Sequence, residues 1–121
     1  MRPRSVVLVV CSALALTAST ALGVASAASP GNATKGKALY LRPGVFCYTC
    51  HILKAAGSTG RDGPNLDQTK PSFARIVAAV TKGSNPSKKW PTGMPGYARA
   101  GELTKAEIQD LAAFVYASTH K

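Results

Sequence analysis

The segment CYTCH, residues 47–51, brings together most of the thiol and imidazole chemistry of the chain. It contains two of the three cysteines and one of the two histidines found in 121 residues. Two thiols and an imidazole at this spacing could ligate a metal ion, form a redox-active dithiol or attach a prosthetic group covalently. Each of these chemistries requires different partners elsewhere in the sequence.

A zinc site and a redox-active dithiol both lack their usual sequence context. Structural zinc takes four ligands, usually from two separated pairs, whereas the fourth candidate here is His120, beside the C-terminal Lys121. A thioredoxin-like C-x-x-C normally lies next to a βαβ pattern, and the chain shows no such alternation. C-x-x-C-H is instead the signature of covalent c-type haem attachment, which the sequence favours over both alternatives.

The spacing of the motif suits this attachment. If residues 47–51 form a helical turn, Cys47, Cys50 and His51 share one face, because residues three and four apart are neighbours on a helix surface. Two thiols on one face can bond the two vinyl groups along one haem edge, and the adjacent imidazole can ligate the iron. We therefore predict one covalently attached haem c on Cys47 and Cys50, with His51 as an iron ligand.

The N-terminal residues have the three parts of a secretory signal. Two arginines precede an apolar run over residues 6–16, and the segment closes on the small residues Ala25-Ser26-Ala27. Cleavage after Ala27 would leave residues 28–121 as one mature domain on the periplasmic or extracytoplasmic side of the cell membrane. The alternative is an uncleaved anchor, because the apolar run could extend toward the roughly 20 residues that a membrane span needs.

Three longer helices are predicted around the CYTCH turn. The first has Asn32 as its N-cap and continues through Tyr40. The second follows Pro71, expected near its first helical position, and stops at Gly83. Its apolar residues recur at i, i+3, i+4 and i+7: Phe73, Ile76, Val77 and Val80. The third opens with a capping box, Thr104 to Glu107, and carries an apolar stripe: Ile108, Leu111, Phe114 and Val115.

Long loops separate these helices. Residues 54–70 and 84–101 are rich in glycine, proline and small polar residues, and they predict irregular structure. No strand alternation or internal repeat is visible, so we predict an all-α domain of about four short helices. A domain of fewer than about 100 residues is marginal as a bare polypeptide, and loops of this length are normally functional or disordered. A haem packed between the loops would account for both features.

Met94 is the candidate for a second iron ligand. It becomes the only methionine once Met1 is removed, and it lies between two prolines in the segment PTGMPGY, residues 91–97. A thioether is a soft ligand, and a Met/His pair raises the haem reduction potential. Two alternatives remain: Met94 could simply fill a gap in the core, or His120 could be the ligand, although its terminal position predicts fraying.

These residues together resemble the small bacterial monohaem class I c-type cytochromes. The resemblance covers nearly all of residues 28–121 in the family's order, and its motifs are Gly36 with Tyr40, Cys47-Tyr-Thr-Cys-His51, Gly63-Pro-Asn-Leu66, Gly93-Met-Pro95 and the closing helix from Leu103 to Tyr116. It implies a cytochrome c-like fold, thioether bonds to Cys47 and Cys50, His51 as the proximal ligand and Met94 as the distal ligand.

The resemblance also implies supporting contacts. The backbone carbonyl of Pro64 would accept a hydrogen bond from the proximal imidazole and orient it. Gly36 and Tyr40 would cross the terminal helix near Leu111 and Phe114. Weaker candidates for contact with the haem propionates are Arg61, Asn65, Trp90 and Tyr97. The chain departs from many family members in a longer linker, residues 41–46, and in Ile52, where glycine is frequent after the motif histidine.

An iron with both axial positions filled by side chains can exchange an electron but offers no open site to a substrate. The expected function is therefore that of an exported one-electron carrier and not of an enzyme. The alternatives are an electron-entry subunit of a larger oxidoreductase, and a membrane-tethered cytochrome if the signal segment is retained.

The charge of the chain indicates the kind of partner. The formal net charge is +10, and removal of Arg2 and Arg4 leaves 13 basic and 5 acidic residues, or +8. An exported protein without a nucleic-acid-binding motif is not expected to bind nucleic acid. The basic residues could form a docking face for acidic redox proteins, such as a terminal oxidase or a membrane quinol-oxidising complex, or for an anionic membrane surface; otherwise they are a scattered, solvated surface. The protein is expected to act as a monomer.

Overall fold

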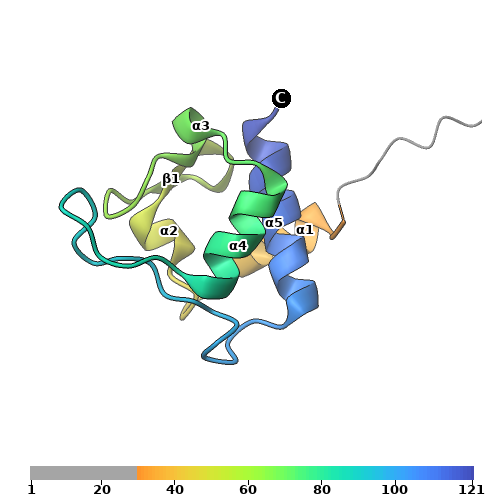
Figure 1. Cartoon of the computed structure of the whole chain (residues 1–121). Helices are drawn as coiled ribbons and strands as arrows, with labels where there is room; N and C mark the ends of the chain where they lie inside the picture. Colours follow the sequence, from red (N-terminus) through yellow and green to blue (C-terminus); the bar gives the residue numbers. More distant parts are fainter. Residues whose placement is uncertain (1–29) are drawn as a thin grey trace, which may run out of the picture.

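The computed structural model describes residues 30–121, in which helices dominate (Figure 1). The predicted signal segment, residues 1–27, lies outside the described range. In chain order the elements are α1 (Ala33–Tyr40), α2 (Cys47–Cys50), β1 (Ile52–Leu53), the 3-10 turn η1 (Lys54–Ala56), β2 (Ser58–Thr59), α3 (Leu66–Thr69), α4 (Phe73–Lys82) and α5 (Lys105–Thr119). Within residues 30–121, no helix has the length and apolar character needed to cross a membrane. The predicted all-α class is confirmed, with one small hairpin in addition.

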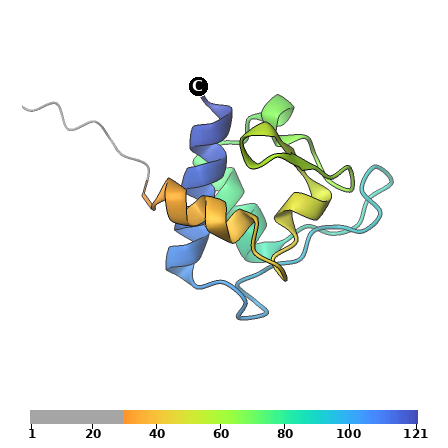
Figure 2. The same cartoon turned by 180° about the vertical axis from the view of Figure 1, so that it is seen from behind.

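The helices α1 and α5 cross (Figures 1 and 2), and Gly36 lies where their backbones come close. Asn32 caps α1 as predicted, because its side-chain oxygen accepts a hydrogen bond from the backbone N–H of Lys35 at 3.0 Å. A Cβ atom at residue 36 would lie 2.8 Å from the Cβ of Phe114 and would clash with the backbone carbonyl of Asp110. Only glycine therefore allows α1 to approach α5 this closely, and the crossing that the family resemblance implied is present.

The terminal helix α5 supplies much of the core. Its predicted capping box is present: Glu107 N–H donates to Thr104 Oγ1 at 3.2 Å, and Thr104 N–H donates to the Glu107 carboxylate at 2.8 Å. The predicted apolar stripe is buried, and the rings of Tyr40 and Phe114 pack in a T-shaped arrangement with 5.7 Å between their centroids. These contacts join the two ends of the domain.

The helix α4 packs against α5 and follows the predicted periodicity, with Ile76 and Val80 buried. Its start differs from the prediction. Ser72 is the N-cap and accepts a hydrogen bond from the N–H of Arg75 at 3.3 Å, so Pro71 precedes the cap and does not occupy the first helical turn. A serine hydroxyl can pair one of the free N–H groups of the first turn, which explains why the helix begins after Ser72.

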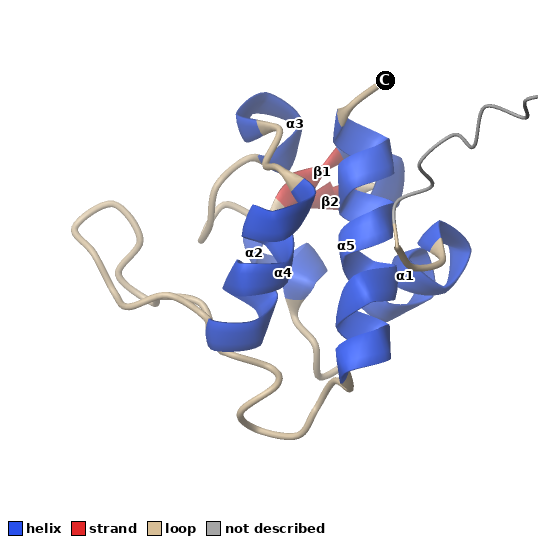
Figure 3. Cartoon of the chain, turned by 45° about the vertical axis from the view of Figure 1, so that its right-hand side comes forward, coloured by secondary structure: helices blue, strands red, loops and turns tan. Residues whose placement is uncertain are grey.

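The prediction of an irregular loop over residues 54–70 was wrong in part. A short antiparallel hairpin pairs Ile52 with Thr59 and Leu53 with Ser58 (Figure 3). Ser58 Oγ holds it in place: it accepts from the Leu53 N–H at 3.0 Å and lies 3.0 Å from the buried hydroxyl of Tyr40. Further along, the Asn65 side chain caps the single-turn helix α3. These elements are too short to produce a detectable sequence period.

Candidate functional site

One cavity of about 650 Å³ lies between the helices and the two long loops. Its walls are predominantly apolar, and Asp62 and Arg75 are the two lining residues with an acidic or strongly basic side chain. The lining includes Cys47, Cys50, His51 and Met94, together with Leu111 and Val115 from α5. All four predicted site residues are thus brought to one cavity.

The two cysteines lie on the short helix α2. Phe46, the residue before it, has a left-handed backbone with φ of 58°, an unusual conformation for a bulky residue, and its carbonyl accepts from the Thr49 hydroxyl at 2.7 Å. Cys47 is buried and Cys50 is half-buried. Burial raises the pKa of the Cys47 thiol to about 12, whereas redox-active cysteines have lowered pKa values. The structure therefore gives no support to the redox-active dithiol.

His51 follows α2 in an extended conformation, with φ of −113° and ψ of 144°. The prediction that it shares one helical face with the two cysteines was therefore wrong. It nevertheless lines the same cavity as the cysteines because the chain turns at the end of α2. Its Nδ1–H donates to the carbonyl of Pro64 at 2.8 Å. This bond fixes the tautomer in which Nε2 carries the lone pair that a metal requires.

Gly63 is part of the same support. A Cβ atom at residue 63 would lie 2.7 Å from His51 Cε1 and 3.0 Å from Nδ1. The N–H of Gly63 also donates to the carbonyl of Cys50 at 2.8 Å. The Gly-Pro segment is therefore bonded both to the motif backbone and to the motif imidazole.

Met94 reaches the cavity from the loop between α4 and α5 and is half-buried. This loop is irregular as predicted, except for an isolated antiparallel bridge between Ser84 and Met94. His120, the rival ligand, is not among the cavity residues. Its ring stacks on Tyr116 with 4.1 Å between centroids, and its Nδ1 lies 3.1 Å from the Tyr116 carbonyl.

The four weaker candidates for contact with the haem propionates are divided between two cavities. Trp90 and Tyr97 line the main cavity, whereas Arg61 and Asn65 line an adjacent one of about 540 Å³ that shares Trp90 with it. Tyr97 also spans the site, because its buried hydroxyl donates to the carbonyl of Val45, two residues before Cys47. Burial raises the pKa of this hydroxyl well above its usual value, so it remains a neutral donor.

Sequence reasoning missed Arg75. It lies on α4 directly before the buried Ile76 and lines the main cavity. The sequence signal that could have identified it is its place next to Ile76 in the apolar pattern of the helix. A residue at the edge of the buried face of a helix can reach a site beside that face.

Among residues 30–121, no group of three or more His, Cys, Asp and Glu residues is arranged to hold a metal ion. The structure therefore gives no support to the zinc alternative.

Comparisons with known proteins agree with the site geometry. A family model described as cytochrome c oxidase, cbb3-type, subunit III, matches residues 31–115. The chain belongs to the c-type cytochromes. The crystal structure of the c-type cytochrome SorU from Sinorhizobium meliloti matches this cytochrome with 34% sequence identity and a TM-score of 0.61, over 73% of this chain and 91% of SorU. No curated protein sequence matches significantly.

As a small monohaem class I c-type cytochrome, the protein carries one covalent haem c with its iron. The residues around the main cavity fit this group. The two thiols of α2 open onto a large apolar cavity, and an imidazole with its Nδ1 already bonded and a thioether reach the same cavity. Sulfur and imidazole nitrogen are both established haem-iron ligands.

Proposed function

We propose that this cytochrome is an exported electron carrier in which haem is attached to Cys47 and Cys50 and its iron is ligated by His51 and Met94. Membership of the family already implies haem-based electron transfer. The observation that carries the finer proposal is that an imidazole and the thioether of a distant loop line one cavity together with both thiols of the motif.

The chain's own residues prepare the iron site. The Pro64 carbonyl holds the His51 ring in one tautomer and increases the electron density on Nε2, because it accepts the Nδ1–H bond. Met94 supplies a soft sulfur that favours reduced iron and raises the potential. The haem, when bound, would supply the one-electron chemistry, and His51 and Met94 would together leave its iron no free site for a substrate.

The N-terminal sequence supports export to the periplasmic or extracytoplasmic side, with residues 1–27 as a cleaved signal and residues 28–121 as the cytochrome domain. If the segment is retained, the same domain acts as a membrane-tethered carrier. Mass spectrometry of the mature protein distinguishes the two, because cleavage after Ala27 makes residue 28 the N-terminus.

A second function is favoured by the description of the matching family model, which names an oxidase subunit. On this alternative the cytochrome is the electron-entry subunit of a larger oxidoreductase. Purification from native membranes under mild conditions tests it: a stable complex with a catalytic subunit supports the subunit role, and a free cytochrome that shuttles electrons between separate proteins supports the carrier.

Redox proteins are the partners expected of a c-type cytochrome. We propose that those of this cytochrome have acidic docking faces, as a terminal oxidase or a membrane quinol-oxidising complex could, and that it meets them as a monomer. The net positive charge of the chain supports partners with acidic docking faces. Lys88 and Lys89 belong to the loop over residues 85–92, which extends away from the helices (Figures 1 and 3). Peripheral contact with an anionic membrane is also consistent with this charge, and nucleic acid is not a proposed partner.

Substitution of Met94 tests the ligand pair. The oxidised wild-type protein should show the weak near-infrared sulfur-to-iron charge-transfer band, and the reduced protein should not bind carbon monoxide. Met94→Ala should abolish the band and open the iron to carbon monoxide, whereas His120→Ala should leave both properties unchanged. The opposite pattern would assign the distal position to His120.

A further inference from the structure

The loop that carries Met94 is joined to the end of α4 by backbone contacts. Ser84 N–H donates to the Met94 carbonyl at 2.9 Å, and Met94 N–H donates to the Ser84 carbonyl at 3.0 Å. The N–H of Tyr97 donates to the carbonyl of Val80 at 2.9 Å. The last carbonyls of a helix have no partner within the helix, and here the Met94 loop supplies one.

Two glycines allow this approach. A Cβ atom at residue 96 would lie 2.7 Å from both the carbonyl carbon and oxygen of Lys82. A Cβ atom at residue 83 would lie 2.7 Å from the N of Gly96 and would clash with the Met94 carbonyl. The atoms in the way belong to the backbone, so they cannot move aside as a flexible side chain could. At both positions the two segments meet backbone to backbone.

We infer that Gly83 and Gly96 are positioning residues for the distal ligand. With Ser84 they form a backbone clamp, residues 83–84 and 94–97, that holds Met94 at the cavity whether or not its sulfur is bonded. The inference rests on the proposed role of Met94 as the distal ligand. Because the clamp orders the loop during folding, the sulfur loses little further entropy on binding, and an external ligand must compete with a preorganised donor.

Imidazole binding to the oxidised holoprotein measures this competition. In Gly83→Ala and Gly96→Ala the added methyl group must push the loop from α4, and overpacking of this kind should raise imidazole affinity by about 5- to 100-fold. The near-infrared band should weaken in parallel. Gly101→Ala is the matched control, because Gly101 has φ of +69°, close to +72° at Gly83, but a Cβ there meets nothing within 4 Å. We expect wild-type affinity in this variant.

Equal imidazole affinities in the wild type and all three variants would overturn the inference. An increase in Gly101→Ala as large as in Gly83→Ala would do the same, because backbone strain alone would then explain the effect.

Hydrogen exchange of the wild-type holoprotein gives a test that does not depend on the folding of any variant. The amides of Ser84, Met94 and Tyr97 should exchange more slowly than those of Ser87 and Gly101, whose hydrogen bonds close local turns in the same long loop. Equally fast exchange would show that the clamp opens freely and would overturn the inference. A different result would show that Met94 is not the iron ligand. In that case the near-infrared band would be absent from the wild type while these amides still exchanged slowly, and the clamp would have no ligand to position.

Discussion

His51 is held by two neighbours that restrict its ring. Pro64 accepts its Nδ1–H bond, and Gly63 lies so close that a single added carbon would contact the ring. If His51 ligates the iron as proposed, this hydrogen bond would give the imidazole partial imidazolate character and stabilise oxidised iron relative to reduced iron. On the proposed ligation by His51, the potential of the haem would be set in part by a backbone carbonyl that is not itself a ligand.

Gly63→Ala should raise the reduction potential. The added methyl group would displace the ring from Pro64, weaken the Nδ1–H bond and so reduce electron donation to iron. We also expect a loss of about 1–3 kcal/mol in stability from overpacking. Potentiometric titration measures the first effect. Gly57→Ala is the control, because a Cβ there meets nothing within 4 Å and should leave the potential unchanged. An unchanged potential in Gly63→Ala would show that the Pro64 bond does not tune the iron.

The crossing of α1 and α5 joins the first and last helices of the described domain beside the site. Gly36 lies at the closest approach, and α1 also positions Tyr40, which supports the hairpin after the motif through Ser58. Burial raises the pKa of the Tyr40 hydroxyl to about 12, so this contact remains neutral over the physiological range. A change at the crossing should therefore reach the proximal side of the cavity.

Gly36→Ala should destabilise the holoprotein. Alanine gains about 1 kcal/mol over glycine in helix propensity, but the backbone carbonyl of Asp110 blocks the methyl group and overpacking costs about 1–3 kcal/mol or more. A net loss is expected in urea unfolding followed by haem absorption. Lys37→Ala, at the exposed neighbouring position, should change stability by about 0.5 kcal/mol or less. Equal urea-unfolding midpoints for the two variants would contradict a tight crossing of α1 and α5.

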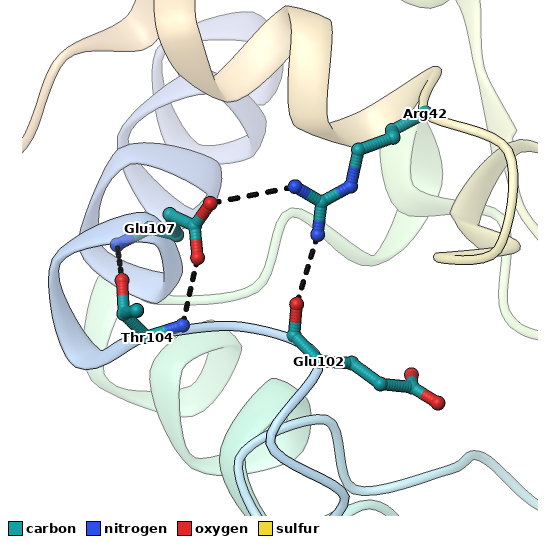
Figure 4. Close-up of polar contacts among 4 residues, drawn as sticks. All are labelled: Arg42, Glu102, Thr104 and Glu107. Atoms are coloured by element: carbon teal, nitrogen blue, oxygen red, sulfur yellow. Dashed lines mark hydrogen bonds and ion pairs between the residues drawn. The ribbon is translucent and has the colours of Figure 1, made fainter.

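The start of α5 is bonded to the linker before the motif (Figure 4). Arg42 forms an ion pair with the Glu107 carboxylate at 3.4 Å and donates to the backbone carbonyl of Glu102 at 2.9 Å. Hydrogen bonds from the backbone and side chain of Thr104, assisted by the charge of Arg42, lower the pKa of Glu107 below its ordinary value of 4.5. Arg42 thus joins the linker to the start of α5 through the Glu107 carboxylate and the Glu102 carbonyl, and of these two groups only the carboxylate can ionise.

Stability should depend on the ionisation of Glu107. Because its folded-state pKa is depressed, its contribution is complete above the unfolded pKa near 4.5 and is lost as the pH falls through the lower folded value. Glu107→Gln should therefore show a flatter fall in urea midpoint below about pH 4.5 than the wild type. Glu102→Gln should retain the wild-type profile, because Arg42 bonds the backbone of Glu102 and not its carboxylate (Figure 4). Parallel profiles for the wild type and Glu107→Gln would refute the coupling.

Charge acts at the scale of the whole molecule. Without Arg2 and Arg4, the chain has 13 basic and 5 acidic residues. This excess gives the protein a positive electrostatic field at neutral pH. A field of this kind accelerates encounter with an acidic partner more than it strengthens the final complex.

Electron transfer to an acidic acceptor should slow steeply as salt is added, because the Debye length falls to about 8 Å near physiological ionic strength. Charge reversal at Lys88 and Lys89 should slow it more than reversal at Lys35 and Lys37, since the first pair lies on the extended loop and the second on α1. Stopped-flow rates at several salt concentrations measure both effects. A rate insensitive to salt and to these substitutions would mean that the basic residues serve solubility alone.

The sequence by itself determined the features that depend on neighbours along the chain. CYTCH identified the cofactor, the i, i+3, i+4 pattern of α4 and the apolar stripe of α5 located two helices, and Asn32 and the Thr104–Glu107 box marked helix starts. These signals are local because helix hydrogen bonds and caps join residues a few positions apart.

Only the tertiary structure decided how distant segments meet. It bonded the backbone of Met94 to that of Ser84, brought Arg75 to the cavity, and formed a hairpin whose Ser58 is hydrogen-bonded to Tyr40. These contacts leave little trace in the sequence because each joins backbone groups that every residue has, or single side chains without a repeating pattern. The glycines at residues 63, 83 and 96 show this most clearly, since their requirement comes from the atoms that pack against them and not from their neighbours in the chain.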